Sequence, residues 1–113
     1  MPSYLLTVES SSRSGDRLLV LPRVPLQRLA PDMFMPMADD KLELHLPDGR
    51  VQHASVGSFG VEHWRDEEGN FWTTSDPANP VLTLTIAGDL HAEDVPPGTE
   101  IWLSEARYKT PDH

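Results

Sequence analysis

Apolar and polar residues alternate with period two in two clear segments of the chain. Residues 41–46 read K-L-E-L-H-L and residues 81–86 read V-L-T-L-T-I. This alternation is typical of half-buried antiparallel strands, in which successive side chains point to opposite faces. The side chains expected to form the core are Leu5, Leu18, Val20, Leu42, Leu44, Leu46, Val56, Leu82, Leu84, Ile86, Val95 and Ile101.

Shorter runs between turn-forming residues indicate further strands, at residues 4–9, 17–24, 50–64, 71–74 and 99–103. Pro22 fits the second of these only at an edge, a bulge or the strand end, because proline donates no ladder hydrogen bond. Gly57 and Gly60 predict a bend or bulge in the long strand. Residues 10–16 are predicted to be a turn or flexible loop.

Two loop regions complete the predicted architecture. Residues 47–49, Pro-Asp-Gly, predict a tight hairpin, since proline presets the first turn position and glycine accepts positive φ. Residues 27–40 contain Pro31 and Pro36 and predict a crossover loop with one short helical turn. The fold class expected is all-β, a single small, mostly antiparallel closed barrel over residues 1–103. It is followed by a polar tail at 104–113, and no helix exceeds about three turns.

The charge of the chain narrows the classes of partner. The formal net charge is −9, from 9 Lys and Arg against 18 Asp and Glu. Such a surface repels phosphate backbones, so direct nucleic-acid binding is not expected. The acidic balance is consistent with a basic protein partner, but a charged surface that provides only solubility is the simpler interpretation.

Other features of composition exclude several classes of site and of location. The chain has no cysteine, which excludes disulfides, thiolate metal sites and cysteine nucleophiles. Neither a secretory signal nor a membrane-spanning stretch is recognised, so a cytoplasmic protein is expected.

The sequence contains no recognisable catalytic motif. No nucleophile elbow or glycine-rich phosphate loop occurs, so neither catalytic residues nor a cofactor are predicted, and enzyme activity is not expected. The alternative is a small metal-binding protein or hydrolase that uses His45, His53 or His63. No recognised ligand spacing supports it, and exposed histidines on strands are the simpler interpretation, with no metal bound.

The bulkiest apolar side chains outside the alternating strands suggest a partner-binding surface. Methionine-rich loops and tryptophan anchors are common at interfaces. The alternative is that these side chains fold inward and cap the barrel. The residues assigned to this surface are Met33, Phe34, Met35, Met37, Trp64, Phe71 and Trp72.

Residues 88–103 read G-D-L-H-A-E-D-V-P-P-G-T-E-I-W-L. This run resembles the end of the second domain of elongation factor Tu and related translation factors, with Glu93, Asp94, Val95 and Gly98 at matching positions. The resemblance implies a six-stranded Greek-key barrel that acts as a non-catalytic contact module. Departures are the lack of a GTPase domain, residues 10–16 in place of a glycine-rich turn, and the larger loop at 27–40.

The sequence-based hypothesis for function is therefore an acidic protein-interaction module with an unidentified, basic protein partner. The alternative is a translation-linked module that contacts the ribosome or RNA, as the resemblance implies. The charge favours the first, because few basic residues are available to meet phosphates.

Overall fold

The computed structural model describes residues 2–29, 35–61, 64–72 and 80–105, with only the backbone at 64, 65, 71 and 72. The strands are β1 (Ser3–Thr7), β2 (Ser10–Ser14), β3 (Arg17–Pro25), β4 (Lys41–His45), β5 (Val51–Gly60), β6 (Trp64–Arg65), β7 (Phe71–Trp72), β8 (Val81–Ala87) and β9 (Glu100–Leu103). Two short 3₁₀ helices, η1 (Leu26–Arg28) and η2 (Ala92–Asp94), are the only helices within these described ranges.

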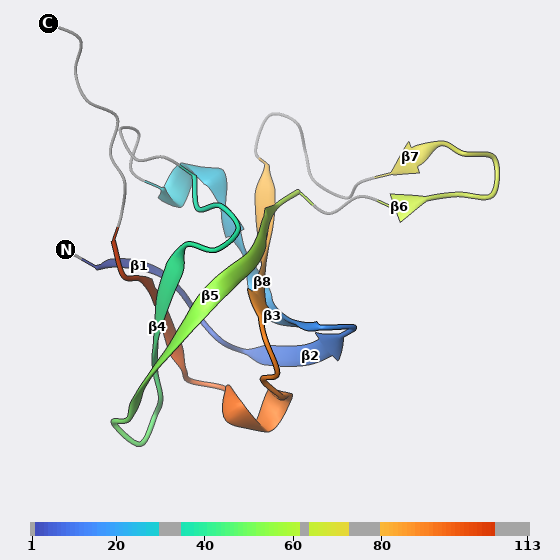
Figure 1. The fold of residues 1–113 in the computed structure, drawn as a ribbon. Coiled ribbons are helices and arrows are strands. Elements are labelled where there is room, and N and C mark those ends of the chain that lie inside the picture. Colours follow the sequence, from blue (N-terminus) through green and yellow to red (C-terminus); the bar gives the residue numbers. More distant parts are fainter. Residues whose placement is uncertain (1, 30–34, 62–63, 73–79, 106–113) are drawn as a thin grey trace, which may run out of the picture.

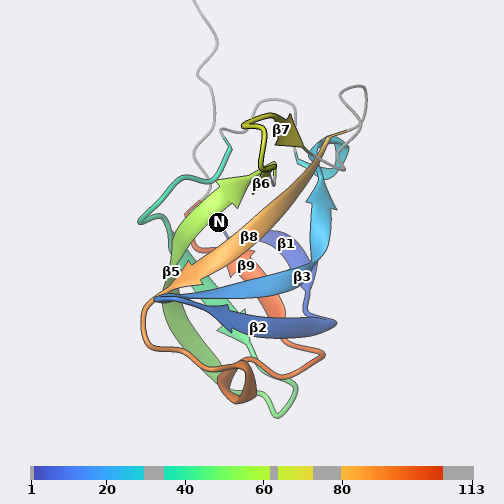
Figure 2. The same cartoon turned by 90° about the vertical axis from the view of Figure 1, so that its right-hand side faces the viewer.

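Seven strands form one antiparallel sheet in the order β1-β9-β4-β5-β8-β3-β2. The sheet is strongly curled into a half-barrel, so that its inner face surrounds the core (Figure 1; Figure 2). Strands β6 and β7 form a separate two-stranded hairpin, which extends away from the sheet in Figure 1. The all-β, antiparallel class predicted from the alternation is confirmed.

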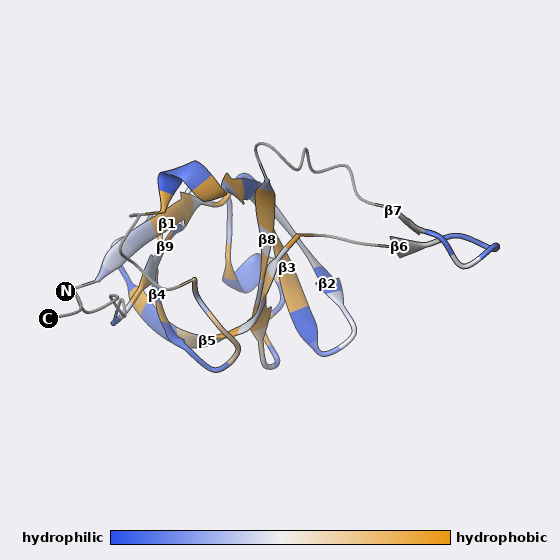
Figure 3. Cartoon of the chain, turned by 90° about the horizontal axis from the view of Figure 1, so that it is seen from above, coloured by the Kyte–Doolittle hydropathy of each residue, from blue (hydrophilic) through white to orange (hydrophobic). Residues whose placement is uncertain are grey.

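The core lies along the inner face of the curled sheet, and Figure 3 shows hydrophobic residues distributed along its strands. Every side chain that the alternation assigned to the core is buried, and Leu6, Val8, Val24 and Leu103 are buried in addition. Leu5 and Leu6 are both buried although they are adjacent, because the register of β1 against β9 shifts between Tyr4 and Leu6. Such a bulge turns two successive side chains inward.

The turn or flexible loop predicted at residues 10–16 is confirmed only at Gly15 and Asp16, which form a turn, and is wrong for residues 10–14. Residues 10–14 form β2, an edge strand that pairs with β3 from Ser10 opposite Leu21 to Ser14 opposite Arg17. The prediction failed because every residue of this strand is polar. A strand at a sheet edge can lack apolar residues, since its backbone is held by one neighbour and its side chains remain exposed.

The predicted hairpin turn and the bulge predicted at Gly57 are confirmed, whereas Gly60 pairs in regular register with Thr83 at the end of β5. Gly49, at φ +94°, donates its N–H to Leu46 O in the hairpin between β4 and β5. The register of β5 against β8 shifts between Val56 and Ser58, at Gly57. Pro22 follows a cis peptide bond, in the irregular stretch of β3 between Val20 and Val24. In the predicted crossover loop, η1 supplies a short helical turn, and residues 30–34 lie outside the described part.

Candidate functional site

The outer face of β1, β9, β4 and β5 carries two transverse rows of side chains. In the first row, Tyr4 lies opposite Trp102, Trp102 opposite Glu43, and Glu43 opposite His53. Glu43 and Trp102 each lie between two buried apolar residues of their strand, so they point to the outer face, and strand pairing places Tyr4 and His53 on the same face. Four residues from four strands therefore form one continuous line across the sheet.

The second row runs beside the first. Thr7 lies opposite Glu100, Glu100 opposite His45, and His45 opposite Val51. Thr7, Glu100 and Val51 are exposed, while His45 is partly exposed. Together the two rows form a surface that we call the aromatic face: Tyr4, Thr7, Glu43, His45, Val51, His53, Glu100 and Trp102.

Ring contacts connect the two rows. The ring centroids of Tyr4 and Trp102 are 5.5 Å apart at an interplanar angle of 69°, an edge-to-face arrangement. The His45 and Trp102 centroids are 5.7 Å apart at 28°, a stacked arrangement. The Arg28 guanidinium, from η1, lies 5.6 Å from the centroid of the Tyr4 ring. Trp102 is thus the centre of the aromatic face, with a ring on each side.

Both carboxylates of the aromatic face are held by neighbouring side chains. Glu43 Oε1 lies 3.0 Å from His45 Nε2. The Trp102 indole Nε1–H donates to Glu100 Oε1 over 3.1 Å. The carboxylates are therefore oriented beside the indole, which places negative charge next to an aromatic surface, the combination that attracts a cation.

The predicted alternative of a histidine metal site receives little support from the geometry. His53 lies opposite Glu43 rather than opposite His45, and His63 lies outside the described residues. Within the described ranges, no three histidine or acidic side chains lie close enough together to hold a metal ion.

The predicted partner surface falls only partly within the described structure. Met35 and Met37 are 41% and 60% exposed. Met33 and Phe34 lie outside the described residues, as do the side chains of Trp64, Phe71 and Trp72, whose backbones form β6 and β7. Strands β6 and β7 form a separate hairpin that extends away from the sheet (Figure 1), whereas the segment holding Met35 and Met37 leads directly into β4. The described parts of the two groups are not adjacent.

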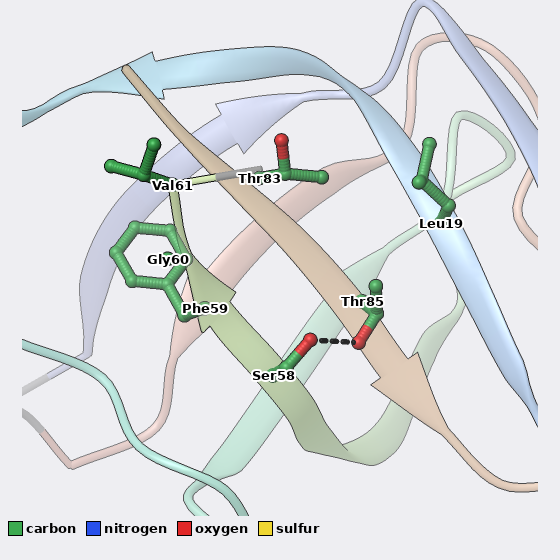
Figure 4. Close-up of a pocket in the computed structure, with 7 residues that line it drawn as sticks. All are labelled: Leu19, Ser58, Phe59, Gly60, Val61, Thr83 and Thr85. Carbon is green, nitrogen blue, oxygen red and sulfur yellow. Dashed lines mark hydrogen bonds between the residues drawn. The ribbon is translucent and has the colours of Figure 1, made fainter. Parts of the chain in front are cut away.

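The second candidate site is a shallow hollow on the outer face of β3, β8 and β5 (Figure 4). It holds about 240 Å³ and is lined by Leu19, Ser58, Phe59, Gly60, Val61, Thr83 and Thr85. The hydroxyl oxygens of Ser58 and Thr85 are 2.7 Å apart and hydrogen-bonded. Its volume is below the usual range of ligand pockets, so the aromatic face is the stronger candidate.

Sequence reasoning did not single out Trp102, Tyr4 or Glu100, and it considered His45 and His53 only as candidate metal ligands. Alternation in residues 41–46 already placed Glu43 and His45 outside, and the burial of Ile101 and Leu103 implies that Trp102 is outside too. The alternation of apolar and polar residues shows on which face of the sheet each side chain of a strand lies. It does not give the pairing of β9 with both β1 and β4, on which the aromatic face depends.

Comparison with family models, with curated proteins and with solved structures finds no match. The resemblance to the second domain of elongation factor Tu gains no support from these comparisons. Among the described residues, no helix has the length and apolar character needed to cross a bilayer.

Proposed function

We propose that this protein is a non-catalytic interaction module that binds a basic protein partner through the aromatic face. The observation that carries the proposal is the central position of Trp102, in contact with the rings of Tyr4 and His45 and flanked by Glu43 and Glu100. Aromatic anchors with oriented polar neighbours are typical of interface hot spots.

The charge of the chain supports a basic protein rather than a nucleic acid as partner. The net charge is −9. The two acidic residues of the aromatic face, Glu43 and Glu100, both lie close to Trp102. Complementary charge accelerates encounter with a basic partner and disfavours an acidic one. A phosphate backbone would meet repulsion at this face.

We also propose that the fold is a closed Greek-key barrel of the type found in the second domain of elongation factor Tu. Its support is that β4, β5 and β8 are consecutive neighbours while β3, which precedes them after a long connection, lies beside β8. A second support is that β1 and β2, the two ends of the sheet order, follow one another in the chain. Closure would run through Val8, whose N–H bonds to Thr99 O, and Glu9, whose N–H bonds to Leu21 O.

Affinity capture from a lysate of the source organism tests the proposed function. We expect the wild-type protein to retain a specific basic protein, and Trp102→Leu to lose it, because the substitution removes the ring while keeping apolar bulk. Glu93→Gln, on η2 and exposed, serves as control and should retain the partner. Equal retention by wild-type protein and Trp102→Leu would refute the proposal.

The same experiment separates the alternatives. A translation-linked module would retain RNA or ribosomal particles, and that retention would be lost after nuclease treatment and weaken steeply with salt. A metal protein would purify with stoichiometric metal that is lost in His45→Ala or His53→Ala. Either result would replace the proposed function.

A further inference from the structure

We infer that Trp102 is the receptor for an arginine side chain of the partner, with the guanidinium on the indole and within reach of Glu43 and Glu100. This inference rests on the proposed function and specifies the chemistry of its binding face. The proposed occupant of the aromatic face is an arginine-bearing segment of the partner. Three observations lead to it.

The first observation is that the protein already holds one guanidinium at the edge of this face. Arg28 lies 5.6 Å from the centroid of the Tyr4 ring, and Tyr4 contacts Trp102 directly, with 5.5 Å between centroids. Cation–π attraction within about 6 Å of a ring is strongest for tryptophan and is made by arginine more often than by lysine. The larger ring, at the centre of the face, has no such cation among the described residues.

The second observation is the placement of the carboxylates around the indole. Glu43 lies opposite Trp102 on β4, and Glu100 lies two residues before it on β9. Directly paired side chains have Cβ atoms about 5 Å apart, and alternate residues of one strand lie about 7 Å apart. A guanidinium that lies on the indole is thus close enough to contact both carboxylates. Its five N–H donors suit two separate acceptors better than the compact ammonium group of lysine does.

The third observation is that each carboxylate retains acceptor capacity. One oxygen of Glu43 contacts His45 and one oxygen of Glu100 accepts from Trp102. In the described ranges, the second oxygen of each has no side-chain partner. Contacts within the face therefore hold the carboxylates in position without using all of their acceptors, and charge-assisted bonds to a guanidinium can use the rest.

Titration with two short peptides tests this inference. The probes are capped pentapeptides of alternating glycine with arginine or with lysine, followed by two-dimensional NMR of the tryptophan indole N–H signals. We expect the arginine peptide to shift the Trp102 signal and to bind several-fold more tightly than the lysine peptide. The double variant Glu43→Gln/Glu100→Gln should weaken binding by about tenfold, because both charge-assisted contacts are lost.

A second double variant controls for the loss of two negative charges in Glu43→Gln/Glu100→Gln. Glu93→Gln combined with Glu67→Gln removes the same charge at exposed sites on η2 and in the turn between β6 and β7. It should change the affinity by less than about twofold, since general charge effects of distant surface groups are weak. Thermal melts confirm that each variant is folded. The two Glu→Gln changes lie on the surface, so the test does not depend on Trp102→Leu being stable.

Several outcomes would overturn the inference. Equal affinity for the two peptides would show that the guanidinium is not recognised, and equal loss in both double variants would show that the carboxylates beside Trp102 are not used. Binding of a neutral oligosaccharide in preference to the arginine peptide would assign the face to sugars. If lysate capture still depends on Trp102 while the peptide results fail, the interaction module remains and only the arginine receptor is refuted.

Discussion

At the scale of single residues, Gly57 is required by a close approach between β5 and β8. A Cβ added there would lie 2.8 Å from Thr85 Oγ1 and 3.3 Å from the backbone nitrogen of Ala87. We predict that Gly57→Ala lowers the free energy of unfolding by about 1–3 kcal/mol, the usual cost of overpacking. Urea denaturation of the wild-type protein and of Gly57→Ala measures this difference in the free energy of unfolding.

Gly60, in the same strand, is the matched control. A Cβ there has no heavy atom within 4 Å, so Gly60→Ala should be neutral or slightly stabilising, since alanine loses less backbone entropy than glycine. A Thr85→Ala background should reduce the cost of Gly57→Ala, because it removes the nearest atom. Equal effects of the two glycine substitutions would contradict the steric explanation.

Thr83 shows a second residue-scale effect. The residue is 5% exposed, and its hydroxyl has no hydrogen-bond partner in the part of the chain that the structure describes. Because a buried hydroxyl without a partner is destabilising, Thr83→Val should raise the free energy of unfolding by about 1 kcal/mol. Thr85→Val should lower it by a similar amount, since the Thr85 hydroxyl is bonded to Ser58. Chemical denaturation of both variants gives the comparison, and a destabilised Thr83→Val would mean that its hydroxyl is satisfied in solution.

At the scale of elements, the stability of the hairpin between β4 and β5 depends on pH through the carboxylate of Asp48. The backbone N–H of Arg50 donates to Asp48, and the Arg50 guanidinium adds a second contact of 2.7 Å. These contacts hold the pKa of Asp48 below its ordinary value of 3.8, the backbone bond being the largest cause. The stabilisation is therefore complete above that ordinary value and is lost as the pH falls through the lowered pKa.

Carboxyl-detected NMR titration checks this prediction. Asp48 should titrate below 3.8 in the wild-type protein. In Arg50→Ala its pKa should rise only part of the way, because the backbone donor remains while the guanidinium is lost. Asp48→Asn should remove the pH dependence of the hairpin chemical shifts in this range. An Asp48 pKa unchanged by Arg50→Ala would exclude the guanidinium as a cause.

At the scale of the whole molecule, the proposal that the curled sheet closes into a barrel can be tested by hydrogen exchange. Val8 and Glu9 connect β1 to β2, and their N–H groups bond to Thr99 O and Leu21 O, each over 2.8 Å. In a closed barrel these amides should be protected to within about tenfold of those of the central strand β4, because all would open together. Exchange orders of magnitude faster at Val8 and Glu9 would indicate an open sheet with fraying ends.

Most of the core and the local turns could be predicted from the sequence. Alternation identified the inward residues of β4 and β8, and Pro-Asp-Gly predicted the hairpin after Leu46, because these features depend on neighbours within a few residues. The polar edge strand β2 was missed because its residues, Ser10–Ser14, show no alternation of apolar and polar side chains. Its strand conformation depends on pairing with β3, which local composition does not report.

The aromatic face was decided only by the tertiary structure. The sequence by itself determines that Tyr4, Glu43 and Trp102 lie on the side of their strands opposite the core. It does not determine that β9 pairs with both β1 and β4, which brings together residues nearly a chain length apart. Strand neighbours and register follow from how the curled sheet buries all its apolar faces at once, and from bulges such as that at Leu5 and Leu6, so they are properties of the whole fold.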